Sequence, residues 1–260
     1  MPKVSVIMGV YNDEKFLYES IDSILKQSFK DFEFIICDDG STDNSLKIIN
    51  SFKDERIIFL QNEKNLGLAN TLNKCIRCSK GEYIARMDSD DISLNDRLRK
   101  QVEYLDQNLK VAVVGTQAYF IDENGKRFKN FNRTLKISFE ETIRKSNLIH
   151  PSTMIRKNIL NEVKGYSVNE LTHRAEDYDL WCKIAEKGYG LVNLPEYLFE
   201  YRENADAYKK RKYRYRIEEF KIKLYWIRRT NLSIFNYIYA FKPLIVGLIP
   251  SKIMIRRKIR

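Results

Sequence analysis

Several features that define other protein classes are scarce in this sequence of 260 residues. Its four cysteines, at positions 37, 75, 78 and 182, are typical of reduced intracellular thiols rather than of a disulfide framework. Cys75 and Cys78 form one Cys-x-x-Cys pair, but no second pair of ligands accompanies it, as a structural zinc site would require. No stretch of about 18 uninterrupted apolar residues is present, which argues against a conventional membrane-spanning helix.

Two further absences narrow the range of ligands. No Gly-x-Gly-x-x-Gly follows an expected strand, so a dinucleotide site is not predicted. The net charge is +11, yet residues 208–260 hold 16 Lys and Arg against only Glu218 and Glu219, which leaves the other 207 residues at −3. No nucleic-acid motif accompanies this basic tail, and we expect no nucleic-acid partner. Cations gathered in a tail suit another anionic surface, such as a lipid membrane.

Short apolar runs alternate with helical patterns over the first 110 residues. We predict strands at 4–8, 32–36, 56–60 and 82–87. The intervening helices are expected to begin near residue 17, to follow N-cap residues at 41–43, and to span 67–78 and 95–108. This alternation predicts an α/β fold with a Rossmann-like, mostly parallel sheet and flanking helices.

The pattern becomes mixed after residue 110, which divides the chain into three expected parts. Residues 1–110 form the first half of one domain, 111–205 its second half, and 206–260 a basic, aromatic helical extension. In the second part, strands are predicted at 111–115 and 118–121, followed by a hairpin turn at 122–125 with Asn-Gly at its centre. Aromatic residues beside cations in the third part favour an interfacial membrane element. Packing of these aromatics on the body or in a dimer interface is the alternative.

The acidic segment that contains Asp88, Ser89, Asp90 and Asp91 is the most informative feature. It directly follows an expected strand, and ligands of open α/β sheets bind at the carboxyl ends of strands. Three carboxylates so close together repel one another, and a hard divalent cation that also binds phosphate oxygens would relieve that repulsion. The alternative is an acidic turn that caps the next helix, a structural role that we assign to Asp91. The segment points to nucleoside-diphosphate chemistry with Mg²⁺ or Mn²⁺.

Other polar residues are expected near the same sheet edge. Asp38 and Asp39 end the second strand, where one could bind a base and the other a ribose, although helix capping is an alternative. Tyr11 follows the first strand and could stack on a base or pack as a core aromatic. Glu176 and Asp177 precede apolar residues at helical spacing. They could supply a general base or simply form a favourable acidic helix start.

The ordered set of these motifs resembles the inverting nucleotide-sugar glycosyltransferases of family 2, of the bacterial surface-polysaccharide type, which have the GT-A fold. The resemblance runs from residue 3 to about 203. The matching segments lie at 4–12, 38–43, 65–68, 81–91, 150–152, 175–181 and 201–202.

The resemblance implies a site for each step of sugar transfer. Asp177 would be the catalytic base, and Asp90 would ligate Mn²⁺ or Mg²⁺. The donor, a UDP-sugar, would be bound by Val10, Tyr11, Asp39, Asn70, Asp88 and Ser89. The acceptor, a saccharide or lipid-linked saccharide, would be bound by His150, Glu176 and Trp181. The implied location is cytoplasmic, peripheral at the inner face of the cell membrane.

Three departures from the family pattern refine this interpretation. Ala69-Asn70 stands where many members have Arg-Asn, and Tyr201-Arg202 is followed by Glu203-Asn204, without the usual histidine. The Gln-x-x-Arg-Trp signature of processive synthases is absent, so we expect transfer of a single sugar. The alternative is a nucleotidyltransferase acting on sugar phosphates. It would normally have a Gly-rich basic loop after the first strand, and none is present.

Overall fold

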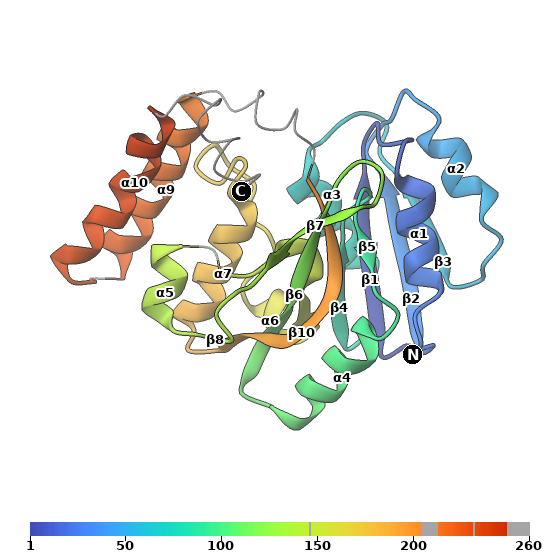
Figure 1. The fold of residues 1–260 in the computed structure, drawn as a ribbon, viewed down its shortest axis with the longest axis horizontal. Coiled ribbons are helices and arrows are strands. Elements are labelled where there is room, and N and C mark those ends of the chain that lie inside the picture. The colour runs from blue at the N-terminus through green and yellow to red at the C-terminus, as the bar shows by residue number, and fades with distance from the viewer. Residues whose placement is uncertain (146, 204–212, 231, 249–260) are drawn as a thin grey trace.

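The computed structural model describes residues 1–145, 147–203, 213–230 and 232–248, and is built on a single ten-stranded sheet (Figure 1). The strand order is β3-β2-β1-β4-β9-β6-β10-β5, with β7 paired to β6 and β8 paired to β10. The strands are β1 (Val4–Val10), β2 (Phe32–Asp38), β3 (Ile57–Gln61), β4 (Tyr83–Met87), β5 (Ile92–Ser93), β6 (Val111–Ile121), β7 (Arg127–Phe131), β8 (Lys136–Ile137), β9 (Met154–Arg156) and β10 (Gly190–Arg202). The helices are α1 (Leu17–Leu25), α2 (Ser45–Ser51), α3 (Leu68–Cys78), α4 (Arg97–Gln107), α5 (Phe139–Arg144), η1 (His150–Ser152), α6 (Lys157–Glu162), α7 (Glu176–Glu186), α9 (Tyr213–Arg229), η2 (Ile234–Asn236) and α10 (Tyr237–Gly247).

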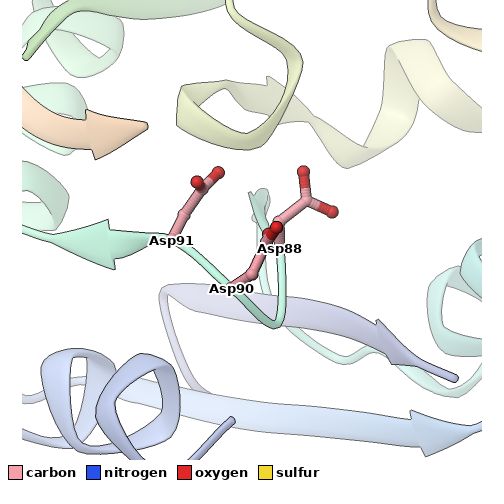
Figure 2. Close-up of side chains that lie close together, drawn as sticks. All are labelled: Asp88, Asp90 and Asp91. Atoms are coloured by element: carbon pink, nitrogen blue, oxygen red, sulfur yellow. The ribbon is translucent and has the colours of Figure 1, made fainter. Parts of the chain in front are cut away.

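The first four strands form the parallel part of the sheet, as expected from the alternating pattern. β1 lies between β2 and β4, β3 lies at the outer edge, and all three pairings are parallel. In this register Val10 pairs with Asp38, and Asp38 pairs with Gln61. The carboxyl ends of the strands therefore meet along one edge, where β4 leads directly into the acidic loop (Figure 2).

The second part of the sheet is mixed. β9 runs antiparallel to both β4 and β6, whereas β6 and β10 pair in parallel. The hairpin predicted at 122–125 is confirmed between β6 and β7, and Gly125 has a φ of 77° that suits glycine. Residues 111–121 form one continuous strand instead of the two that we predicted. Gly115 lies within this strand. Glycine is required there because a Cβ would lie 2.4 Å from Oδ1 of Asn193.

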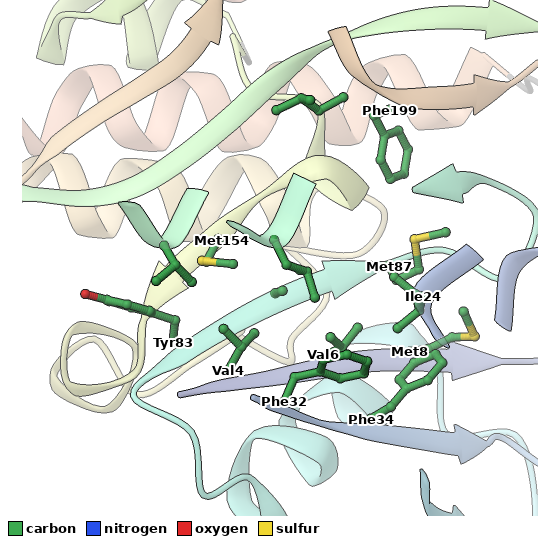
Figure 3. Close-up of a cluster of buried hydrophobic side chains, with 14 of the residues drawn as sticks. Val4, Val6, Met8, Ile24, Phe32, Phe34, Tyr83, Met87, Met154 and Phe199 are labelled. Carbon is green, nitrogen blue, oxygen red and sulfur yellow. The ribbon is translucent and has the colours of Figure 1, made fainter. Parts of the chain in front are cut away.

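Apolar side chains fill both faces of the sheet, as a parallel sheet requires. One cluster joins β1, β2 and β4 to α1, α2 and α4, and Figure 3 shows part of it, including Val6, Phe34 and Met87. A second cluster on the opposite face joins the sheet to α3, α6 and α7. The sheet is thus packed between two layers of helices, and this packing fixes the positions of the loops at its carboxyl edge.

The described part of the C-terminal region is a helical hairpin. α9 and α10 lie side by side at the end of the molecule opposite α1 and α2 (Figure 1). Ile222, Trp226 and Ile227 of α9 pack in a third apolar cluster with α5 and α7. Among the described residues, no helix has the length and apolar character needed to cross a membrane. Residues 206–212, 231 and 249–260 of the expected extension lie outside the described residues.

Candidate active site

The loop after β4 brings three carboxylates together. Ligand oxygens of Asp88, Asp90 and Asp91 all lie within 4.8 Å of one another. Figure 2 shows the side chains of Asp88 and Asp91 rising from the same side of the loop, with the carboxylate of Asp90 beside that of Asp88. The hydroxyl of Ser89 donates a hydrogen bond of 2.6 Å to Asp13. The geometry fits the expectation of a cation site at this sheet edge.

Arg202, at the end of β10, holds this loop in place. Its backbone N–H donates to Oδ1 of Asp91 at 2.7 Å, and its Nε donates to the backbone carbonyl of Asp90 at 2.7 Å. A third bond of 2.6 Å joins the guanidinium to Glu19 of α1. Asp91 is buried and has the structural role expected of it. It anchors the loop to β10, however, and not to the start of α4.

A buried arginine lies beneath the carboxylates. Arg86 is only 2% exposed and forms an ion pair with Asp88. Its Nε is buried without a hydrogen-bond partner among the described residues. A cation in so dry an environment interacts strongly with every nearby charge, because water does not screen it. Its field reaches Asp90 and Asp177, whose carboxylate pKa values it lowers against the effect of burial.

The carboxylates carry more negative charge than the arginine balances. Burial, followed by repulsion from Asp88 and Asp13, raises the pKa of Asp90 to about 7. Oδ2 of Asp91 is buried without a hydrogen-bond partner among the described residues. An unpaired carboxylate oxygen and an acid with a raised pKa are both features that a divalent cation would stabilise. The residues present therefore fit Mn²⁺ or Mg²⁺, with oxygen-only ligands of the type that both ions prefer.

The loops after β1 and β2 lie at the same edge. The carboxylate of Asp39 accepts N–H bonds from Asn62, Leu66 and Gly67 at 2.7–2.9 Å, so it fixes the loop before α3. Asp38 is also buried, and its carboxylate has longer contacts of 3.2–3.4 Å with Ser41 and Gln61. Base binding by Asp39 stays a prediction, and in this structure its oxygens already have three donors.

The neighbouring donor-site candidates differ in exposure. Val10 is buried, and its carbonyl accepts the N–H of Asp39 at 2.7 Å, so any contact with a nucleotide would be indirect. Tyr11 is 49% exposed and its ring is free to stack on a base. Asn70, in the first turn of α3, donates to the carbonyl of Leu66 and lines a cavity of about 210 Å³. Glu176 lines the same cavity, so the structure brings residues of both halves together.

Asp177 lies in the first turn of α7, where its carboxylate accepts the N–H of Tyr178 at 2.7 Å. Burial, followed by repulsion from Glu176, raises the pKa of Asp177 to about 6. It also lines a cavity of about 260 Å³ between α7 and α9. A carboxylate with a pKa close to neutrality that lies beside a cavity is suited to accept a proton.

His150 is buried against Tyr166 and Trp181, within the field of Arg86. Its Nε2 lies 2.7 Å from the hydroxyl of Tyr166, and its ring packs edge-on against Trp181 at 5.8 Å between centroids. Burial, followed by the charge of Arg86, lowers the pKa of His150 well below its usual value, so the ring is neutral. Trp181 is 1% exposed and belongs to the core, so it would act on an acceptor only through His150.

Four residues at the site carried no separate prediction from the sequence: Asp13, Arg86, Tyr166 and Arg202. Arg86 and Arg202 stand inside segments that the family resemblance already covers, and a charged residue within an apolar strand run was the available signal for Arg86. Asp13 follows Asn12, whose φ of 50° turns the chain back toward the acidic loop. Tyr166 had no signal, because only the fold places it beside His150.

Comparisons with known proteins agree with this geometry. The family model Glycosyl transferase family 2 matches residues 5–164. EpsE of Bacillus subtilis, described as a glycosyltransferase, is 42% identical over 260 residues, which covers 98% of this chain and 92% of EpsE. The Escherichia coli protein WfaP is named a UDP-Glc:α-D-GlcNAc-diphosphoundecaprenol β-1,3-glucosyltransferase. It is 28% identical over 246 residues, which covers 94% of this chain and 95% of WfaP.

Solved structures show the same fold. The UDP complex of S. aureus TarS superposes with a TM-score of 0.68 at 22% identity, covering 95% of this chain and 70% of that one. The mannosyltransferase PcManGT of Pyrobaculum calidifontis, in complex with GDP-Man and Mn²⁺, superposes with a TM-score of 0.65 at 18% identity, covering 99% and 79%. The fold is the GT-A fold, with its mostly parallel central sheet and flanking helices. The chain belongs to glycosyl transferase family 2.

Proposed function

We propose that this glycosyltransferase moves one sugar from a UDP-sugar to a hydroxyl of a lipid-linked saccharide, with inversion, during surface-polysaccharide biosynthesis. The observation that carries the proposal is the meeting of two acidic centres around buried Arg86. One centre is the carboxylate loop after β4, and the other is Asp177 at the start of α7. The names of relatives such as WfaP, with its UDP-Glc donor and diphosphoundecaprenol-linked acceptor, support these classes of donor and acceptor.

Asp177 is the proposed general base. Above pH 6 its carboxylate is largely deprotonated and can take the proton of an acceptor hydroxyl that attacks the anomeric carbon. Its bond with the N–H of Tyr178 fixes the carboxylate at the helix start. Glu176, one residue earlier, lines the cavity that Asn70 also lines, where acceptor and donor would meet. Attack from the face opposite the departing group makes one displacement sufficient and inverts the anomeric centre.

Asp88 and Asp90 are the proposed residues for a divalent cation, with Asp90 as a direct ligand. When bound, Mn²⁺ or Mg²⁺ would stabilise the negative charge that develops on the departing UDP. Arg202 holds the loop through two bonds, and Arg86 pairs with Asp88 from below. These contacts position the carboxylates in advance, so little reorganisation is needed as the donor binds.

The C-terminal hairpin is the proposed contact with an anionic membrane surface at the cytoplasmic face. Exposed apolar residues recur along one face of η2 and α10 with helical spacing: Ile234, Ile238, Phe241, Ile245 and Leu248. The adjacent helix α9 exposes Arg214, Lys221 and Arg228, which are seven residues apart and so share one face of that helix. Apolar insertion beside a row of cations is the pattern of a helix that lies in the headgroup region. Two copies of this hairpin would bring like charges together, which disfavours a dimer through the same face.

The donor assignment is tested by calorimetric titration of UDP with and without Mn²⁺, followed by a panel of UDP-sugars. Metal-dependent binding of UDP is the expected result, and the panel then ranks the sugars. Binding of GDP in place of UDP would overturn the donor assignment but keep the enzyme class. A folded sample that binds no nucleotide would contradict the proposed function as a whole.

A further inference from the structure

We propose that the cavity between α7 and α9 binds the phosphate groups of the acceptor, beside the carboxylate of Asp177. The inference rests on the proposed function, because it assumes an acceptor that carries its saccharide on a lipid phosphate or diphosphate. The cavity has a volume of about 260 Å³. Asp177 and Arg174 border it from the start of α7, and Arg216, Glu219 and Lys223 border it from α9. The structure thus places three cations next to the candidate base.

The charges on α9 leave the cavity electropositive. Arg216 pairs with Oε2 of Glu219 at 2.9 Å, and Lys223 lies 3.3 Å from Oε1 of the same carboxylate. One carboxylate is thus shared by two cations. Lys223 is only 7% exposed, so solvent screens its charge poorly. An anion that entered the cavity would complete the charge balance of this group.

Arg174 is the cation with the clearest capacity for a ligand. Its guanidinium stacks on the ring of Tyr215 at 4.2 Å, and the ion pairs formed among the described residues do not include it. Stacking orients the plane of the guanidinium while leaving N–H groups at its edge to donate to phosphate oxygens. Arg174 also has a φ of 60°, unusual for a residue other than glycine, so the backbone holds it in a specific direction.

The position of this cavity favours phosphate groups of the acceptor over those of the donor as its ligand. Donor phosphates are proposed to bind at Asp88 and Asp90 with the cation, whereas this cavity adjoins Asp177, which must meet the acceptor hydroxyl. Arg174 and His173 border this cavity and also the one that Asn70 lines, so they separate the two. Ligand pockets usually enclose about 300 Å³ or more, so the volume suits a phosphate headgroup rather than a whole lipid-linked saccharide. α9 then leads to the exposed apolar face of α10, where a lipid chain could lie.

The test is calorimetric titration of decyl phosphate below its micelle concentration, in EDTA so that no metal can bridge the phosphate. The wild-type protein should bind one molecule, and Arg174→Gln and Arg216→Gln should each weaken binding about tenfold, because each removes one cation from the cavity. The matched control Arg77→Gln removes an exposed arginine from the last turn of α3 and should leave the dissociation constant unchanged. The neutral probe decyl β-glucoside, with the same chain, should bind at least tenfold more weakly than decyl phosphate.

If decyl phosphate binds to the wild type, three results would still overturn the inference. The first is that the wild type and both cavity variants bind decyl phosphate equally. The second is that several molecules bind per protein, as on a diffuse basic surface. The third is that decyl β-glucoside binds as tightly as decyl phosphate. Titration of UDP with Mn²⁺ into the same protein preparations, in buffer without EDTA, distinguishes failure of this inference from failure of the proposed function. If UDP binds but decyl phosphate does not, only the acceptor cavity is wrong. If neither binds to a folded sample, the proposed function fails too.

Discussion

The donor side of this molecule and its acceptor side are built on different principles. On the donor side, residues 1–110, four parallel strands deliver their loops to one edge. The buried carboxylate of Asp39 there accepts three N–H bonds, while the carboxylates after β4 keep unpaired charge for a cation. On the acceptor side a helix start and a helical hairpin present the charges, and Asp177 has one backbone donor and a raised pKa. Arg174 there has Tyr215 as its partner and forms no ion pair among the described residues.

The contrast indicates where specificity and reactivity reside. A fully hydrogen-bonded loop is rigid and suits a ligand that many enzymes share, such as a nucleotide. Buried charged groups with few partners lower the stability of the folded protein. They are typical of sites where a bound ligand supplies the missing partners. We therefore expect substitutions on the donor side to alter nucleotide affinity, and those on the acceptor side to alter turnover or acceptor affinity.

Asp177→Asn is the substitution with the largest expected effect. It keeps the acceptor of the Tyr178 N–H bond but removes the base, so kcat should fall by about 10³-fold while the affinity for UDP and Mn²⁺ is retained. Steady-state assays and calorimetry on the same sample measure both. A large loss of UDP affinity would place Asp177 on the donor side instead of the acceptor side.

Asp90→Asn tests the opposite side. Loss of one charged ligand should weaken binding of UDP in Mn²⁺ by about 10- to 100-fold, toward the metal-free value, which calorimetry detects. Asp22→Asn, a half-exposed carboxylate on α1 that pairs with Lys26, is the matched control. If Asp90→Asn left the Mn²⁺ dependence of UDP binding intact, Asp90 would have to be removed from the metal site.

Ile238→Asp concerns the outer surface of the acceptor side. A charge in the middle of the exposed apolar face should lower the partition to vesicles that contain anionic lipid by about tenfold, because it opposes insertion. Co-sedimentation measures the bound fraction. Lys47→Gln, at an exposed position of α2 at the far end of the molecule, lowers the net charge by the same one unit and is the control. Equal partition of both variants would assign membrane binding to another surface.

Glu176→Gln should produce the smallest effect, a shift in pH dependence. Deprotonated Asp177 is the active form, so kcat should rise with pH through an acid limb near pH 6. Glu176 raises this pKa by repulsion, so its removal should move the limb to lower pH. The profile is recorded in saturating Mn²⁺, because metal binding removes the separate titration of Asp90. A limb that stays in place would show that another group controls it.

Sequence periodicity predicted the donor side well and the acceptor side only in part. In parallel βα units the strand, the turn and the helix are set by local patterns, so the edge with Asp38, Asp88 and Asp90 followed from strand ends alone. In the mixed half, short strands such as β8 and β9 have two or three residues each, too few for any periodic signal. The strands predicted at 111–115 and 118–121 form one strand, in which Gly115 leaves room for the side chain of Asn193.

The contacts that no pattern predicted are long-range. Arg202 reaches Asp90 and Asp91 across more than 100 residues, and His150 meets Tyr166 only because η1 and the segment before α7 converge. Side chains such as these are placed by tertiary packing, and nothing in the neighbouring sequence marks their partners.

The stereochemistry of UDP-sugar hydrolysis tests the central claim most directly, because it needs no knowledge of the acceptor. Proton NMR early in the reaction, with water in place of the acceptor and Mn²⁺ replaced by diamagnetic Mg²⁺, shows which anomer is released first. A base at Asp177 and a metal-assisted leaving group at Asp90 predict that an α-linked donor releases the β-sugar, and that Asp177→Asn abolishes this release. Release of the α-sugar, or hydrolysis at the wild-type rate by Asp177→Asn, would contradict a single displacement between the two acidic centres.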